Sequence, residues 1–169
     1  MSSHRHNSRI LAIDPGIRKM GIAFFDSGEL IYHLVKVFPK KETLRDGLGE
    51  VRKVLLRLIR DFNPKIIVVE KSFLGNYRNT FSLNILVKEV KAIGKRKKLK
   101  VIAFAPTTVK KQICGNCYAS KKEVARAVTV RYPELKVYLT QNRLWKEKHH
   151  QNMFDAVALG ITLIRDEKA

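Results

Sequence analysis

The spacing of apolar residues along the chain predicts short strands first and then strands that alternate with helices. Several apolar runs are short enough for strands, and the run over residues 65–70 is continuous, as in a strand that is buried on both faces of a sheet. The expected strands cover residues 10–14, 20–25, 31–38, 65–70 and 100–104. The first two form a hairpin, because Pro15 and Gly16 between them favour a turn.

Helical periodicity appears after the third expected strand. Between residues 44 and 62, apolar residues such as Leu48, Val51 and Leu55 recur at three- to four-residue spacing, which is typical of a helix with one buried face. Further helices are expected over residues 81–98, 106–113, 120–132 and 151–164. The pattern predicts an α/β fold with a five-stranded mixed sheet, in which a three-strand antiparallel meander joins parallel strands and helices cover both faces.

Length and charge limit the possible functions. The 169 residues suit a single domain, expected over residues 9–169 after a disordered basic arm at residues 1–8. With 34 Lys and Arg against 15 Asp and Glu, the net charge of +19 favours a polyanionic partner, nucleic acid before a membrane surface. The apolar runs are far shorter than the roughly 20 residues that span a bilayer, so no membrane span is expected.

Three acidic residues stand at the ends of expected elements in this basic chain. Asp14 and Glu70 each end a buried strand, at the sheet edge where open α/β sheets place their sites. Asp155 is expected in the first turn of the last helix. Three carboxylates suit a hard divalent cation, and two such ions can clamp the attacking and leaving oxygens of a phosphodiester. Taken singly, each acid also has an ordinary explanation as a turn former, a strand end or a helix-dipole partner.

Two cysteines, Cys114 and Cys117, lie in a loop between two expected helices. A zinc site needs four ligands, and the next candidates, His149 and His150, lie far along the chain. We interpret the pair as two reduced thiols, with a redox pair as the alternative, and the role of their loop stays open.

Four blocks in order over residues 10–164 resemble the RuvC family of Holliday junction resolvases, nucleases with a ribonuclease H-like fold. The blocks are Asp14, Pro15 and Gly16 with the later Gly21; Glu70 followed by Phe73; Pro106, Lys110 and Lys121; and Asp155 in the last helix. The resemblance implies a crossover junction endodeoxyribonuclease of DNA recombination and repair. It implies a homodimer on a DNA four-way junction, two Mg²⁺ ions per site with Mn²⁺ as a substitute, no small-molecule cofactor, and products with 5′-phosphate and 3′-hydroxyl ends.

The resemblance also implies site residues. Catalytic roles fall to Asp14, Glu70, Asn152, Asp155 and Lys121, and metal ligation to the first four. The family usually carries Asp or His three residues before its final Asp, where this chain has the neutral Asn152, which would weaken metal affinity. His150 is the alternative ligand, if it precedes the helix and bends inward.

DNA contacts are implied for Phe73, Arg78, Lys110, Lys111, Lys121 and Lys122. Phe73 would stack on an unpaired base where the strands exchange. The lysines beside the acidic crevice would bind phosphate groups. The helix over residues 81–98 is the expected dimer interface, through Phe81, Ile85 and Val90.

Other functions stay open at this point. A nuclease of the same family would act on other branched DNA or on structured RNA, and the neutral Asn152 leaves room for a non-catalytic junction-binding protein. An actin-like kinase is disfavoured, since no second Gly-rich phosphate loop is found. The expected compartment is the bacterial cytoplasm at the nucleoid, with an organelle or a virus-infected cell as alternatives.

Overall fold

The computed structural model describes residues 8–41, 43–71, 78–139 and 144–167. The expected N-terminal arm, apart from Ser8, lies outside these ranges, and so does Phe73. No helix within the described ranges is both long enough and apolar enough to cross a membrane.

One mixed sheet of five strands forms the centre of the structure, in the order β3-β2-β1-β4-β5. The strands are β1 (Arg9–Asp14), β2 (Lys19–Asp26), β3 (Glu29–Val37), β4 (Ile66–Glu70) and β5 (Lys100–Phe104). β2 pairs antiparallel with both β1 and β3, whereas β4 runs parallel to β1 and β5 parallel to β4. The predicted meander followed by parallel strands is confirmed.

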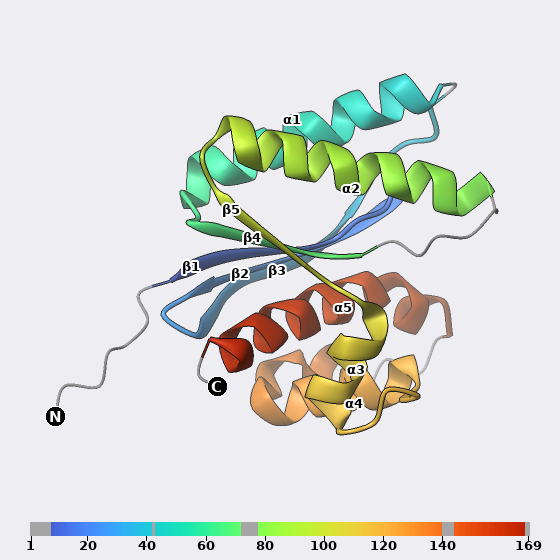
Figure 1. Ribbon diagram of the computed structural model, residues 1–169. Helices are drawn as coiled ribbons and strands as arrows, with labels where there is room; N and C mark the ends of the chain where they lie inside the picture. The colour runs from blue at the N-terminus through green and yellow to red at the C-terminus, as the bar shows by residue number, and fades with distance from the viewer. Residues whose placement is uncertain (1–7, 42, 72–77, 140–143, 168–169) are drawn as a thin grey trace, which may run out of the picture.

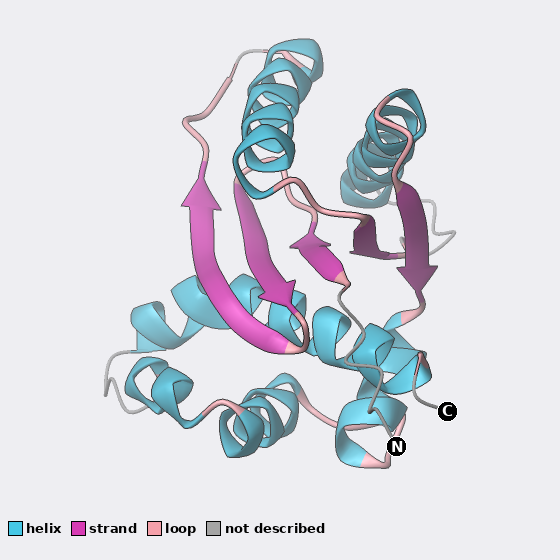
Figure 2. Cartoon of the chain, turned by 90° about the vertical axis from the view of Figure 1, so that its left-hand side faces the viewer, coloured by secondary structure: helices cyan, strands magenta, loops and turns pink. Residues whose placement is uncertain are grey.

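Helices cover both faces of this sheet. They are α1 (Leu44–Phe62), α2 (Arg78–Arg96), α3 (Pro106–Cys114), α4 (Lys121–Arg131), the 3₁₀ helix η1 (Pro133–Tyr138) and α5 (Leu144–Asp166). α1 and α2 lie on one face, while α5 lies against the other with α3 and α4 beyond it (Figure 1). Figure 2 shows the same two helical layers from the side, with the strands between them.

The alternation of side chains along β1 divides the core into two parts. Ile10 and Ala12 pack with the apolar residues of α3, α4 and α5, whereas Leu11 and Ile13 pack with those of α1 and α2. Because successive strand residues point to opposite faces, one fully apolar strand supplies both cores. This explains why the apolar runs of β1 and β4 are continuous rather than alternating.

Local signals fix where two of these helices begin. Thr43 caps α1 by accepting a hydrogen bond of 3.1 Å from the backbone N–H of Asp46. Ser120 and Glu123 form a capping box at the start of α4, with distances of 3.3 and 2.7 Å. Such caps satisfy backbone N–H groups that have no partner within the helix. The start of α4, and therefore the position of Lys121, is set by this local pattern.

The last helix is longer than predicted. α5 begins at Leu144, not near residue 151, and η1 precedes it where no element was expected. The stretch from residue 144 to 150 is mostly polar, so it shows no apolar periodicity even though Lys and Glu favour helices.

Candidate active site

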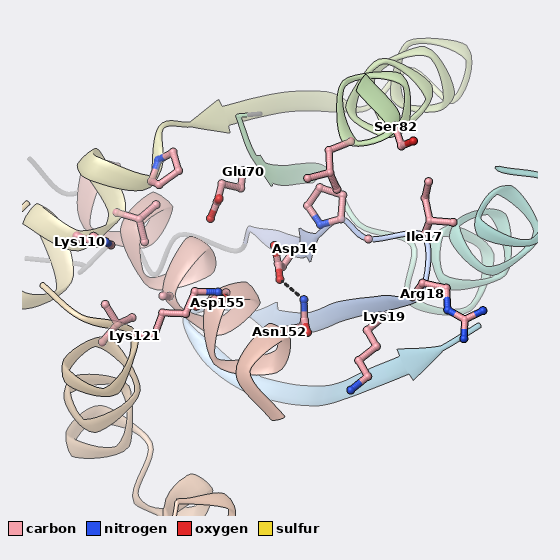
Figure 3. Close-up of a pocket in the computed structure, with 17 residues that line it drawn as sticks. Asp14, Ile17, Arg18, Lys19, Glu70, Ser82, Lys110, Lys121, Asn152 and Asp155 are labelled. Carbon is pink, nitrogen blue, oxygen red and sulfur yellow. Dashed lines mark hydrogen bonds and ion pairs between the residues drawn. The ribbon is translucent and has the colours of Figure 1, made fainter. Parts of the chain in front are cut away.

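A cleft of about 740 Å³ opens where β1 and β4 end. Its lining includes Asp14, Arg18, Lys19, Glu70, Ser82, Lys110, Lys121, Asn152 and Asp155. Figure 3 shows the acids of β1, β4 and α5 around this cleft, with Lys110 and Lys121 on one side and Arg18 and Lys19 on the other. Asp14 and Glu70 are the last residues of their strands, as the sequence predicted.

Asp14 lies beside α5 because of the strand register. Its Cα partner on β2 is Gly21. A Cβ atom at residue 21 would lie 1.7 Å from the backbone oxygen of Asn152, so only glycine lets α5 approach β2 this closely. The Asn152 Nδ2 group consequently donates a hydrogen bond of 2.8 Å to Asp14 Oδ2, which is the dashed line in Figure 3.

Asp155 occupies the middle of α5. The prediction that it lies in the first turn is wrong, because the helix begins eleven residues earlier at Leu144. The alternative explanation of Asp155 as a partner of the helix dipole is therefore also wrong. Its side chain is only 16% exposed. It accepts hydrogen bonds from Gln151 Nε2 at 2.9 Å and from Lys121 Nζ at 3.5 Å. Asn152 and Asp155, three residues apart, therefore present one helix face to the cleft.

His150 does not meet the condition for an alternative ligand. It lies within α5 rather than before it, and it is absent from the residues that line the cleft. Its ring packs against Tyr138 of η1, with 4.6 Å between the ring centroids. The unpredicted 3₁₀ helix thus supplies a ring contact for this histidine.

Burial raises the pKa of all three carboxyl groups, and the charge of a neighbouring carboxylate adds to the shift for Asp14 and Glu70. Burial is the largest cause that holds the pKa of Asp14 well above its usual range, followed by the charges of Asp155 and Glu70. Burial and then Asp155 raise the pKa of Glu70 to about 7. Burial also raises the pKa of Asp155, although the Lys121 charge opposes it. Negative charge in the cleft is therefore incompletely balanced, as in sites that take up a cation or a proton.

The predicted DNA-binding residues divide into two groups. Lys110 and Lys121 line the cleft, and the charge of each lowers the pKa of Glu70. Lys111 and Lys122 are exposed and do not line it. The side chain of Arg78, like Phe73, lies outside the described part of the structure, so their predicted contacts stay predictions.

Comparisons with known proteins identify the family of this chain. A family model described as Crossover junction endodeoxyribonuclease RuvC matches residues 10–163. This chain belongs to the RuvC family. A relative with that name from Prochlorococcus marinus (strain MIT 9312) is 28% identical over 165 residues, covering 94% of this chain and 98% of the relative. One from Parasynechococcus marenigrum (strain WH8102) is 31% identical over 129 residues, covering 71% and 80%.

Solved structures share the fold of this RuvC-family chain. T. thermophilus RuvC in complex with a Holliday junction substrate matches with a TM-score of 0.73 and 21% identity, covering 92% of each chain. A yeast mitochondrial Holliday junction resolvase matches with a TM-score of 0.69 and 18% identity, covering 94% of this chain and 78% of its own. The predicted family, fold and enzyme class, crossover junction endodeoxyribonuclease, are confirmed.

The donor set of this RuvC-family site fits a hard cation in chemistry. Asp14, Glu70 and Asp155 offer carboxylate oxygens whose mutual repulsion a divalent ion would relieve. Within the described ranges, no group of three Asp, Glu, His or Cys side chains is placed to hold a metal ion as it stands. Asn152 turns its Nδ2 group toward Asp14, so its amide must rotate before Oδ1 can reach an ion.

Some residues at the site were missed by sequence reasoning. Gln151 does not line the cleft but donates to Asp155 four residues further along α5, and this i, i+4 spacing in the expected helix was the signal that would have found it. Arg18, in the turn after Asp14, and Lys19, the first residue of β2, also line the cleft. Their position directly after the Pro15–Gly16 turn was the signal that would have found them.

Burial decides which residues of the expected dimer helix are available for an interface. Val90 is fully buried in the core below α2, so its assignment to an interface is wrong, whereas Phe81 is 64% exposed.

Cys114 and Cys117 are free thiols, as interpreted from the sequence. Burial and then the charge of Glu123 raise the pKa of the Cys114 thiol, which makes it less reactive.

Proposed function

We propose that this protein is a structure-selective, metal-dependent endonuclease that resolves four-way DNA junctions by paired nicks, each leaving a 5′-phosphate and a 3′-hydroxyl. The observation that carries the proposal is the meeting of Asp14, Glu70 and Asp155, from three elements, in one cleft that Lys110 and Lys121 border on one side. The names of the RuvC relatives and the junction bound to T. thermophilus RuvC support the substrate.

Mg²⁺, with Mn²⁺ as a substitute, is the proposed cofactor, two ions per site held by Asp14, Glu70, Asp155 and Asn152. When bound, such ions lower the pKa of the attacking water and balance charge on the phosphate. The chain's own contribution is a rigid donor set: two carboxylates at strand ends and one on a helix whose core residues are fully buried. Rigid placement lowers the entropy lost when the reacting groups are aligned.

Two lysines are proposed to hold the substrate phosphate. Lys121 Nζ lies 3.5 Å from Asp155 Oδ2 and remains largely exposed, so it is free to exchange this partner for a phosphate oxygen. Lys110 lines the same wall of the cleft. Positive charge fixed at this position stabilises the negative charge that develops on the phosphate during in-line attack.

A homodimer is proposed from the symmetry of the substrate. A four-way junction has two-fold symmetry, and two matched nicks need two equivalent sites, which a symmetric dimer supplies. On α2, Phe81 presents an exposed ring and Ile85 is half-buried, so an interface would use this part of the helix and not Val90.

Incubation of the purified protein with a synthetic four-way junction in Mg²⁺ or Mn²⁺ tests the proposal. We expect paired nicks, little cutting of linear duplex, and no nicks in Asp14→Asn protein that still binds. Equal cutting of linear duplex would rule out junction resolution. Preferred cutting of flaps, forks or structured RNA would redirect the substrate. Tight binding with no difference between wild type and Asp14→Asn in any product would instead support a non-catalytic junction-binding protein.

A further inference from the structure

The turn between α3 and α4, residues 115–120, displays an aromatic ring to solvent. Tyr118 is 88% exposed, the highest value among the large hydrophobic residues that the structure describes as exposed. An aromatic side chain normally contributes by burying its large apolar surface. At this position the ring adds almost nothing to the packing of the fold, so it is available for contact with a partner.

The backbone below the ring is held firmly. Gly115 ends α3 in the left-handed conformation with φ of 74°, and its N–H donates to the Lys111 oxygen at 2.8 Å. The N–H of Tyr118 donates to Asn116 Oδ1 at 2.9 Å, and the next residue, Ala119, is buried in the core. A ring on an anchored turn loses little conformational entropy when a ligand packs on it.

Positive charge surrounds this turn on both sides. Lys110 and Lys111 lie near the end of α3, and Lys121 and Lys122 open α4. Two of the four, Lys110 and Lys121, also line the carboxylate cleft. The nearest acid in sequence, Glu123, is engaged in the capping box of α4 and accepts from the Ser120 N–H at 2.7 Å.

Lysines that follow a phosphate backbone, next to an exposed aromatic ring, are the combination with which proteins bind unpaired nucleic-acid strands. The turn that carries Tyr118 joins the two helices that carry Lys110 and Lys121, so a strand whose phosphate lies at these lysines is near this turn. We propose that the Tyr118 ring stacks on a nucleobase of the substrate strand, one that is unpaired or weakly paired. This inference rests on the proposed function, and it adds a contact separate from the one predicted for Phe73.

Binding of a four-way junction by Tyr118→Ala and Tyr118→Phe variants tests the stacking role. The measurements use the Asp14→Asn background, in which the junction stays intact. Stacking contributes about 1–3 kcal/mol per base, so Tyr118→Ala should raise Kd by about 5- to 150-fold, while Tyr118→Phe stays within about twofold. Val130→Ala is the matched control, because Val130 is 80% exposed but lies at the opposite end of α4 from Lys121 and Lys122.

Two readouts separate stacking from a general loss of affinity. The slope of log Kd against log salt should be the same for Tyr118→Ala and its parent, because the ring carries no charge. A 2-aminopurine base placed in turn at each position near the strand exchange should lose fluorescence on binding at one position, and this loss should disappear with Tyr118→Ala. Thermal unfolding of each variant confirms that the fold is intact.

The proposal is overturned if Tyr118→Ala binds the junction as its parent does and quenches 2-aminopurine equally at every position. That result would leave the proposed function untouched, provided that the wild-type protein still nicks the junction. If the wild-type protein neither binds nor nicks it, the proposed function is wrong and the stacking role falls with it.

Discussion

At the scale of single residues, Asp14 interacts electrostatically with the other strand acid, Glu70, and with the helix acid, Asp155. It accepts a hydrogen bond from Asn152, and the charges of Asp155 and Glu70 raise its pKa after burial has done so. Its carboxylate is therefore the group that most needs an added positive charge when the site is ionised. The first predictions concern this group and its neighbours.

Asp14→Asn should lower the rate of junction cleavage by at least about 100-fold while leaving junction binding within a few-fold, because the proposed role of this residue is to hold cations rather than DNA. Single-turnover cleavage and gel-shift measurements check this. Asp26→Asn is the matched control, since Asp26 also ends a strand but pairs with Arg9 and lies outside the cleft. Cleavage by Asp14→Asn at the control rate would remove Asp14 from the mechanism.

Glu70→Gln should stabilise the metal-free protein at about pH 8 and have little effect at about pH 4. The pKa of Glu70 rises from 4.5 to about 7 on folding, so the folded state binds more protons and stability falls as pH rises through that window. The substitution removes this cost, at most about 3 kcal/mol. Urea unfolding in a chelator measures it, and an equal effect at both pH values would contradict the cause.

Asn152→Asp should lower the melting temperature of the metal-free protein and raise its affinity for Mn²⁺. The change replaces a donor 2.8 Å from Asp14 with a fourth carboxylate. This carboxylate adds electrostatic repulsion when no ion is bound, and it adds a ligand when an ion is bound. Melting curves in chelator and in MnCl₂ give both effects. A variant that melts below wild type even in saturating Mn²⁺ would show that the added charge is not used for metal binding.

At the scale of elements, the approach of α5 to β2 sets the site. Gly21 lets the backbone of α5 approach the β2 backbone, and Gly160 on α5 leaves room for the Phe25 ring of β2, since a Cβ at residue 160 would lie 2.0 Å from that ring. The distance between β2 and α5 therefore decides whether Asn152 reaches Asp14. The packing of α5 on the sheet therefore also brings the site residues together.

Gly21→Ala should destabilise the fold by about 1–3 kcal/mol and reduce cleavage further than the stability loss explains, because the new methyl group moves Asn152 away from Asp14. Gly49→Ala is the control: a Cβ there meets nothing within 4 Å, and alanine favours the helix. Thermal unfolding and cleavage at a temperature where both variants are folded separate the two effects. Equal behaviour of the two variants would contradict the packing argument.

Elements with clear periodicity were predictable, and those without it were not. The bounds of α1 agree with the prediction because its apolar residues repeat at helical spacing. The first part of α5 is polar and was missed. Periodicity also cannot distinguish a core from an interface, which is why Val90 was misassigned. Acids at strand ends were found from the chain, whereas the Asn152–Asp14 bond depends on tertiary register.

At the scale of the whole molecule, a net charge of +19 surrounds a cleft that gathers three of the 15 acidic residues. The basic surface attracts a polyanion, but the acids repel its phosphates until cations are bound. Binding and cleavage should therefore respond differently to salt and to metal. Lys121 is the residue that we propose for both processes, because it pairs with Asp155 and borders the cleft.

Lys121→Ala should weaken junction binding, reduce the slope of log Kd against log salt by about one, and shift the pH profile of cleavage upward. The upward shift follows because the Lys121 charge lowers the pKa of Asp155, and removing it leaves that carboxyl protonated to a higher pH. Lys53→Ala on α1 is the control, since Lys53 pairs with Glu50 away from the cleft. An unchanged salt slope would exclude a phosphate contact.

The pKa of Glu70 near 7 has a consequence for crystallography of the cleft. Because metal ligands must give up their protons, Mn²⁺ soaked into a crystal grown at about pH 5 competes with protons for the same carboxylate oxygens. Weak metal density in such a crystal would reflect the low pH of the mother liquor and not a low intrinsic affinity of the site for the metal. The same crystal moved to about pH 8 before the soak should show stronger anomalous signal, with the same molecules in the same lattice.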